Sequence, residues 1–446
     1  MSRTNRRAVR WLTGELPALV ASGAISQEQA VAIERHFARD AAPERNVAFT
    51  VIAIVGSILI AAGVVLLVAH NWDELNRPVR CTIALLPLVA AQMLCVFVLR
   101  RRYDSKPWRE SAAIFNVAAI GTAIALVSQT YQIHGSLANF ILTWLLLSLP
   151  LIYLLRTTLG AVAYLVGTAV WATSQWDWSF RIVNPLPFWL LLLLAIPYAV
   201  LAYRRDTRGA VTTLFLAFVI AAAVGLGVTA EYTHANLGLI AFAGLFTLTY
   251  LGGMELFREN GEDHVPLLAL LGGVAVGVMA IVITFRDSWN FHSDRIETGH
   301  AGLALGIVIE ILFPLMAIGL AAFHYIKRRT GLTHLIAAFP LIAVLGSAIA
   351  WSCAKPEYGT SYDCQSVVAL LLNLYTLALG IELLMRGLRA SSITRANFAL
   401  AIIGALAAVR FFDSDLSFIV RGAGFIIIGI AFLFTNFVLF KRRNAA

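Results

Sequence analysis

The feature that most constrains this chain is a long succession of apolar stretches, each about twenty residues long, which is the length at which a helix crosses a bilayer. Of the 446 residues, 59% are apolar and only 13% are charged, whereas a soluble domain carries about 25% charged residues. Lipid must therefore cover most of the surface, and lipid admits only helices or closed barrels. Because the stretches are unbroken rather than alternating, we expect an all-α, polytopic integral membrane protein.

The expected transmembrane helices number about fourteen. Seven lie in the first half of the chain, at residues 46–69, 81–99, 111–129, 138–155, 158–174, 186–203 and 209–229. Seven more lie in the second half, at residues 236–256, 265–284, 301–325, 334–352, 366–385, 396–410 and 419–440.

The distribution of Lys and Arg predicts the orientation, because cytoplasmic segments hold the excess of these residues. With the N-terminus inside, 26 of the 34 Lys and Arg residues fall on the cytoplasmic side and 8 on the other side. We therefore expect both termini in the cytoplasm. The net charge of +9 then reflects topology, and the scattered basic residues give no reason to expect nucleic-acid binding.

The chain is expected to have three parts: a cytoplasmic helical hairpin (1–45), an N-terminal membrane region (46–160) and a C-terminal membrane region (161–446). In the hairpin, Ser26 followed three residues later by Gln29 predicts a capping box at the start of the second helix. So short a segment cannot bury a core of its own, so we expect it to dock on the membrane part or on a partner protein.

Several separated motifs in the N-terminal third resemble one family. They are the hairpin run 23–30 (GAISQEQA), the run 56–63 (GSILIAAG) that leads to 69–73 (AHNWD), and the run 128–133 (SQTYQI) followed by Trp144. Over about residues 10–160 the chain resembles the bacterial membrane family catalogued as domain of unknown function 2157. The resemblance implies a multi-pass protein of the bacterial inner membrane. It supplies no catalytic residue.

Glu310 is the acid whose position most needs an explanation, since it lies about nine residues, or roughly 13 Å, inside its expected span. A charge at that depth is costly. Either the carboxyl is bonded to another helix or it faces a polar cavity and exchanges protons or cations. Gln92, Asn116 and Asn373 are candidate partners, although each alone favours a helix-to-helix hydrogen bond.

Two other acids lie at the cytoplasmic ends of their spans and have a basic residue nearby in sequence. Glu255 precedes Arg258 by three residues, and Glu382 precedes Arg386 by four. These spacings predict ion pairs that anchor the helix ends in the headgroup layer.

A second group of polar and aromatic residues is expected at the periplasmic rim. It comprises Asn71, Trp72, Asp73, Gln129, Tyr131, Gln132 and Asp177. One interpretation is an interfacial aromatic belt with helix caps. The other is a site for a sugar or a lipid headgroup, with Asp73 as a general base.

The cysteines and histidines suggest a disulfide but no metal. Cys353 and Cys364 fall in one outside loop, where an oxidising periplasm would let them form a disulfide. Five histidines fall outside, but none has the spacing of a metal site. The sequence contains no nucleotide-binding or serine-hydrolase motif, so we expect no metal, no cofactor and no identified catalytic residue.

Three functions are consistent with this pattern. The leading hypothesis is transport or flipping of a small or lipid-linked molecule, with proton coupling through Glu310. The second is a membrane transferase that uses a lipid-linked sugar or acyl donor, with Asp73 or Asp177 in its site. The third is a scaffold or sensor whose hairpin binds a partner. A hydrated cavity at Glu310 would favour the carrier, and a sealed, bonded carboxyl would favour a structural role.

Overall fold

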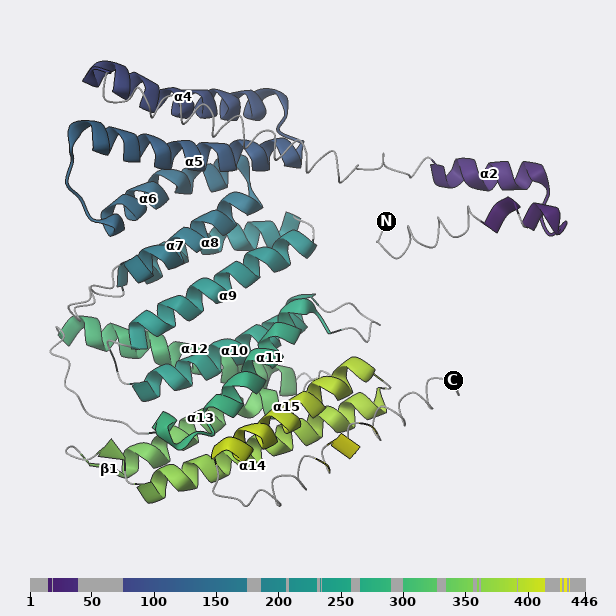
Figure 1. Ribbon diagram of the computed structural model, residues 1–446, viewed down its shortest axis with the longest axis vertical. Helices are drawn as coiled ribbons and strands as arrows, with labels where there is room; N and C mark the ends of the chain where they lie inside the picture. Colours follow the sequence, from purple (N-terminus) through teal and green to yellow (C-terminus); the bar gives the residue numbers. More distant parts are fainter. Residues whose placement is uncertain are drawn as a thin grey trace. The chain divides into compact units, whose positions relative to one another are not determined.

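The computed structural model describes most of the chain between residues 75 and 413 and part of the N-terminal segment (Figure 1). The described residues are 15–17, 19–38, 75–174, 186–205, 208–230, 233, 235–257, 265–289, 300–326, 334–355, 359–360, 362–390, 392–413, 426, 429, 430 and 433. The chain divides into two units, residues 1–80 and 81–446. The expected span 46–69 and most of the span 419–440 lie outside the described residues.

In the first unit, helix α2 (Gln27–Ala38) begins as the sequence predicts. The Gln29 amide N–H donates to the Ser26 hydroxyl at 3.2 Å, and the Ser26 amide N–H donates to Gln29 Oε1 at 2.9 Å. The capping box is therefore confirmed. The turn before it contains Gly23 at a φ of +73°, a conformation that glycine adopts without steric cost.

The second unit is a set of apolar helices connected in chain order (Figure 1). They are α4 (Arg77–Arg101, which starts in the first unit), α5 (Lys106–Tyr131), α6 (Leu137–Leu155), α7 (Thr158–Ser174), α8 (Leu186–Arg205), α9 (Arg208–Ala230), α10 (Ala235–Phe257), α11 (Leu267–Val282), α12 (His300–Ile326), α13 (His334–Ser352), α14 (Tyr362–Arg389) and α15 (Ile393–Asp413). A 3₁₀ turn, η2 (Arg286–Trp289), follows α11.

Each expected span from 81–99 to 396–410 corresponds to one of these helices, so the polytopic all-α architecture is confirmed. Within the described residues, nine helices are long and apolar enough to cross a membrane. Two further apolar helices are shorter, α7 with 17 residues and α11 with 16. We call the end where α9 finishes and α10 and α12 begin the outer end, after the orientation expected from the sequence, and the opposite end the inner end.

Helix α10 is the central element of the second unit, because it contacts α9, α11, α12 and α13. Glycines bring its backbone close to its neighbours. A Cβ added at Gly244 would lie 2.4 Å from the backbone nitrogen of Pro314 in α12. A Cβ at Gly272 of α11 would lie 2.3 Å from the backbone nitrogen of Tyr250. Lipid gives apolar helices no hydrophobic reason to associate, so such close backbone contacts supply the dispersion energy that holds them together.

Two acids at the inner end fix the starts of neighbouring helices. Glu110 of α5 accepts hydrogen bonds from the backbone N–H groups of Thr158 (2.9 Å) and Leu159 (2.8 Å) and from the Thr157 hydroxyl. Its carboxylate thereby satisfies donors that the first turn of α7 leaves free. Glu110 was not singled out from the sequence, because it lies next to a charged loop and looks like an ordinary surface acid.

Glu382 of α14 caps the start of α13 in the same way. It accepts from the backbone N–H groups of His334 and Leu335, both at 3.0 Å. It also forms the expected ion pair with Arg386, whose guanidinium lies 2.9 Å away. That ion-pair prediction is therefore confirmed.

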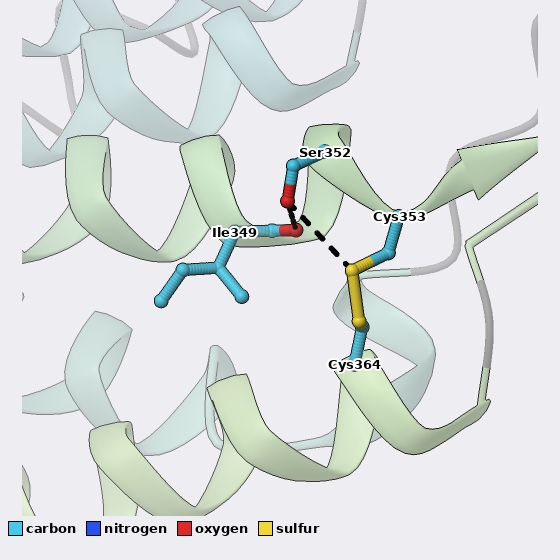
Figure 2. Close-up of a disulfide and its surroundings, with 4 residues drawn as sticks. All are labelled: Ile349, Ser352, Cys353 and Cys364. Atoms are coloured by element: carbon cyan, nitrogen blue, oxygen red, sulfur yellow. Dashed lines mark hydrogen bonds between the residues drawn. A yellow bond between two sulfur atoms is a disulfide. The ribbon is translucent and has the colours of Figure 1, made fainter.

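At the outer end, a disulfide joins Cys353, just after α13, to Cys364 in the first turn of α14 (Figure 2). Between the two cysteines the chain forms a small antiparallel hairpin of strands β1 (Ala354–Lys355) and β2 (Gly359–Thr360). The Ser352 hydroxyl donates to the Ile349 carbonyl at 2.8 Å and ends α13 beside the disulfide. The two helix ends are thus covalently linked, and the hairpin is an addition to the expected all-helical pattern.

The close contact at Gly244 predicts opposite effects for two Gly→Ala changes in α10. Gly252 has open space where a Cβ would go, so Gly252→Ala should raise stability or leave it unchanged because Ala is the better helix former. Gly244→Ala should lower stability by about 1–3 kcal/mol, because the obstructing atoms are backbone. Thermal unfolding in detergent measures both, and equal effects at the two positions would contradict this packing.

The cap on α7 predicts that Glu110→Gln destabilises the protein by about 1–3 kcal/mol. The amide has one acceptor oxygen, so a backbone N–H of α7 would face an NH₂ group in a buried site. The measurement is again the unfolding temperature. The control is Asp104→Asn, which changes an exposed acid in the loop before α5, and an equal effect of the two substitutions would argue against the capping role.

Candidate functional site

The candidate site surrounds Glu310, which lies in the outer half of α12 and is 1% exposed. Its Oε2 lies 2.6 Å from the hydroxyl of Thr233, in the connection between α9 and α10. Among the described residues its Oε1 has no hydrogen-bond partner, and the carboxyl has no cationic neighbour. The site therefore holds a sealed carboxyl of which one oxygen is satisfied and the other is not.

Thr233 and Thr229 connect this carboxyl to α9 and α8. The Thr233 hydroxyl lies 3.4 Å from the Thr229 carbonyl, and the Thr229 hydroxyl accepts the Trp189 indole N–H at 3.1 Å. A hydroxyl has a single proton, so Thr233 can donate to Glu310 or to the Thr229 carbonyl, but not to both. If Glu310 carries a proton and donates it to Thr233, Thr233 is free to donate onward to that carbonyl.

Small residues bring the helices close enough to seal the carboxyl. A Cβ at Gly306 of α12 would lie 2.7 Å from Thr233 Cγ2, and a Cβ at Gly238 of α10 would lie 2.6 Å from Cβ of Ala230. The same position on Gly238 is 3.9 Å from Glu310 Oε1. The unpartnered oxygen therefore faces a part of α10 that has no side chain.

Pro314 lies one turn beyond Glu310 inside α12. Proline has no N–H, so the helical hydrogen bond that would end on the Glu310 carbonyl cannot form, and the proline ring crowds that carbonyl. Such positions are where a membrane helix bends, with neighbouring groups or water satisfying the freed carbonyl. The buried acid therefore lies at the point where α12 lacks a backbone hydrogen bond.

The partners proposed for Glu310 from sequence are corrected by the structure, since none of the three bonds to it. Asn116 is buried and donates to Cys95 Sγ of α4 at 3.1 Å. Asn373 donates to the Ala369 carbonyl of its own helix at 2.7 Å. Gln92 is exposed on α4. Asn116 and Asn373 bond to other groups, and no local spacing indicates that Thr233, at the end of another span, contacts Glu310.

Of the polar and aromatic group expected at the periplasmic rim, the described residues form a helix cap rather than a cluster of converging side chains. Gln132 ends α5 in the left-handed conformation, and its N–H lies 3.3 Å from the Gln129 carbonyl. The side chains of Gln129, Tyr131 and Gln132 are exposed. This geometry fits the cap-and-belt interpretation. Asn71, Trp72, Asp73 and Asp177 lie outside the described residues.

Glu255 contacts a histidine of another helix. Its Oε2 lies 3.2 Å from Nε2 of His324 in α12, while Arg258 lies outside the described residues. The contact links the inner ends of α10 and α12. No group of three or more potential metal ligands occurs among the residues that the structure describes.

Comparison with known proteins concerns the N-terminal third of the chain. Residues 17–161 match the family described as predicted membrane protein (DUF2157). The resemblance inferred from the motifs is therefore confirmed for this segment, and the chain is a multi-pass membrane protein by both its helices and this match. The match includes Glu110 and Asn116 but ends before α8, so Glu310 and its partners lie outside it. No curated protein and no solved structure matches the chain.

Proposed function

We propose that this protein moves a small or lipid-linked molecule across the bacterial inner membrane and that Glu310 carries a coupled proton. The observation that carries the proposal is the half-satisfied carboxyl of Glu310, 1% exposed and without a cation among the described residues. An ionised carboxylate there would bury a charge without compensation, whereas a protonated carboxyl would be neutral and would donate to Thr233.

We expected a sealed, bonded carboxyl to favour a structural role, and the buried bond of Glu310 to Thr233 has that form. The case for proton coupling therefore rests on the second carboxyl oxygen. Glu110 and Glu382 show what structural carboxylates look like in this protein, because both oxygens of each accept hydrogen bonds. Glu310 leaves Oε1 without a described partner. A buried oxygen atom without a hydrogen bond lowers the stability of the fold, and buried polar groups of this kind are concentrated at functional sites.

Pro314 supplies the movement that a carrier needs. Bending of α12 at the Glu310 carbonyl would separate the carboxyl from Gly238 and open it to one membrane face. The structure described here would then be a closed state of the transport cycle. A carrier that exposes its proton site alternately to the two sides must pass through such a state.

The bacterial inner membrane and the inside location of both termini are parts of this proposal. Their support is the excess of Lys and Arg on one side of the helices and the disulfide on the other side, since disulfides persist in oxidising compartments. For the transferase hypothesis, Asp73 and Asp177 lie outside the described residues, and no contact of a described residue favours the scaffold. We therefore propose no second function.

The test of proton coupling uses full-length protein in liposomes that contain a trapped pH dye. A potassium gradient with valinomycin sets the membrane potential and drives protons inward. Wild-type protein should carry a proton flux above that of protein-free vesicles, and Glu310→Gln should reduce it to the protein-free level, because the amide keeps the shape but cannot release a proton.

The control for this test is Glu28→Gln, an exposed acid on α2, which should leave the flux unchanged. The same vesicles can carry a fluorescent phospholipid whose outer-leaflet copies are quenched by dithionite. Protein-dependent quenching of inner-leaflet copies would indicate a lipid-linked substrate. A wild-type flux that persists in Glu310→Gln at equal protein abundance would refute the proposal.

The proposed orientation predicts which cysteine reacts from outside the cell. Cys353→Ser frees the thiol of Cys364 at the outer end, and a membrane-impermeant maleimide should label it in intact cells. The control is Asp104→Cys, in the exposed loop before α5 at the inner end, which should be labelled only after lysis. The reverse pattern would show that the termini face the other side.

A further inference from the structure

His324 is a buried histidine between two hydrogen-bond acceptors. It lies in the last turn of α12 and is 3% exposed. Its Nδ1 lies 2.8 Å from the Leu320 carbonyl, and its Nε2 lies 3.2 Å from Oε2 of Glu255, a residue with 28% exposure in the last turn of α10. A carbonyl can only accept, so Nδ1 must carry the hydrogen of that bond.

The state of Nε2 then follows from its partner. In a neutral ring with hydrogen on Nδ1, Nε2 presents a lone pair, and it would face a lone pair of the Glu255 carboxylate unless a proton lay between them. That arrangement is repulsive. With a second proton the ring is a cation, and the 3.2 Å contact becomes an ion pair. Nε2 forms no hydrogen bond in this geometry, so the attraction in the protonated pair is that between opposite charges.

The C-terminal ends of α10 and α12 also place negative charge near the His324 ring. His324 and Glu255 both lie at C-terminal ends, because α10 and α12 run parallel and their inner ends coincide. The free carbonyls of a C-terminal turn carry partial negative charge, which stabilises a protonated histidine. The Leu320 carbonyl thus fixes a hydrogen on Nδ1, and the helix ends and the Glu255 carboxylate place negative charge beside the ring.

Other ionisable groups lie on the elements packed against α12 at this end. Tyr203 of α8 donates to the Leu256 carbonyl, and the His334 backbone N–H of α13 donates to Glu382. Arg208 begins α9. Within the described residues, the titratable side chain that contacts the His324 ring is Glu255.

We propose that His324 and Glu255 form a second proton-binding site, at the inner end of the same helix pair that holds Glu310 near its outer end. The ligand is a proton, bound as the imidazolium of His324 and held by the Glu255 carboxylate. The two sites are fourteen positions apart on α12, or about 21 Å along the axis. Between them, the backbones of α10 and α12 touch at Gly244 and Pro314.

The movement of a proton between the two sites rests on the proposed function. The contact at Gly244 leaves no room for even a methyl group, so α10 and α12 are tightly packed between the two sites. Bending of α12 at Pro314 would loosen that contact. Glu310 would then take up or release the proton toward the outer side, and His324 with Glu255 would do so toward the inner side.

The experiment measures the protonation of His324 directly. Full-length protein labelled with ¹⁵N-histidine is reconstituted in lipid bilayers, and the ring nitrogens are observed by NMR at neutral pH. The chain has nine histidines, so the loss of one signal set in His324→Gln assigns the residue. We expect two protonated ring nitrogens in wild type and a neutral ring in Glu255→Gln at the same pH.

The controls are Asp104→Asn and Glu310→Gln, which should leave the His324 signals unchanged. A neutral His324 ring in wild type would overturn the proposal, and this outcome does not depend on any variant folding. A cationic ring that persists in Glu255→Gln would overturn the role of Glu255. If the proposed function is wrong, the vesicle proton flux will be unaffected by Glu310→Gln. That result is independent of the NMR signals of His324, so the two proposals can fail separately.

Discussion

The close backbone contact of α10 with α11 and α12 is the constraint on which the rest of the second unit depends. In a bilayer the lipid chains solvate apolar side chains as well as other helices do, so helices associate where their surfaces fit closely enough to gain dispersion energy. Gly244, Gly253 and Gly272 provide that fit, since an added Cβ at each would lie within 2.4 Å of a neighbouring backbone nitrogen. The positions of Glu310 and His324 follow from it, because both lie on the α12 surface that α10 covers.

The acids Glu110, Glu382 and Glu310 show two different ways in which the protein accommodates a carboxyl. Glu110 and Glu382 are placed at the inner ends of the helices, where the free N–H groups of a neighbouring helix supply donors to both oxygens. Glu310 lies against the end of α9 and the start of α10, and it has Thr233 alone as a described donor. Glu110 and Glu382 thus have hydrogen bonds to both carboxyl oxygens and cap neighbouring helices, whereas Glu310 has a described hydrogen bond to one oxygen only.

Helix α12 combines three features that a purely structural helix has no need to combine. It has an under-satisfied acid, a proline one turn later that removes the hydrogen bond to the backbone carbonyl of that acid, and a buried histidine paired with a carboxylate at its inner end. The acid and the histidine both lie against α10, and the proline lies between them where the backbone of Gly244 approaches it closely. A bend at Pro314 would therefore change the surroundings of both ionisable groups together.

The sequence by itself determined the architecture. The spans from 81 to 410 were readable because the cost of an unpaired backbone group in lipid forces each apolar stretch into a continuous helix, whatever its neighbours are. The capping box of Ser26 and Gln29 and the pair of Glu382 with Arg386 were also predicted, because their partners are three or four residues apart. Glu310 stood out for the same local reason, as an acid within an apolar run.

Only the tertiary structure decided which groups meet. Thr233 is 77 residues from Glu310, and Glu255 of α10 contacts His324 of α12, a pairing that no local spacing indicates. Asn116 and Asn373, which were candidates for Glu310, bond elsewhere. Hydropathy gives the length of each helix but not its rotation or its neighbours. Those are set by where small residues let two backbones approach, and that information is spread over pairs of distant positions.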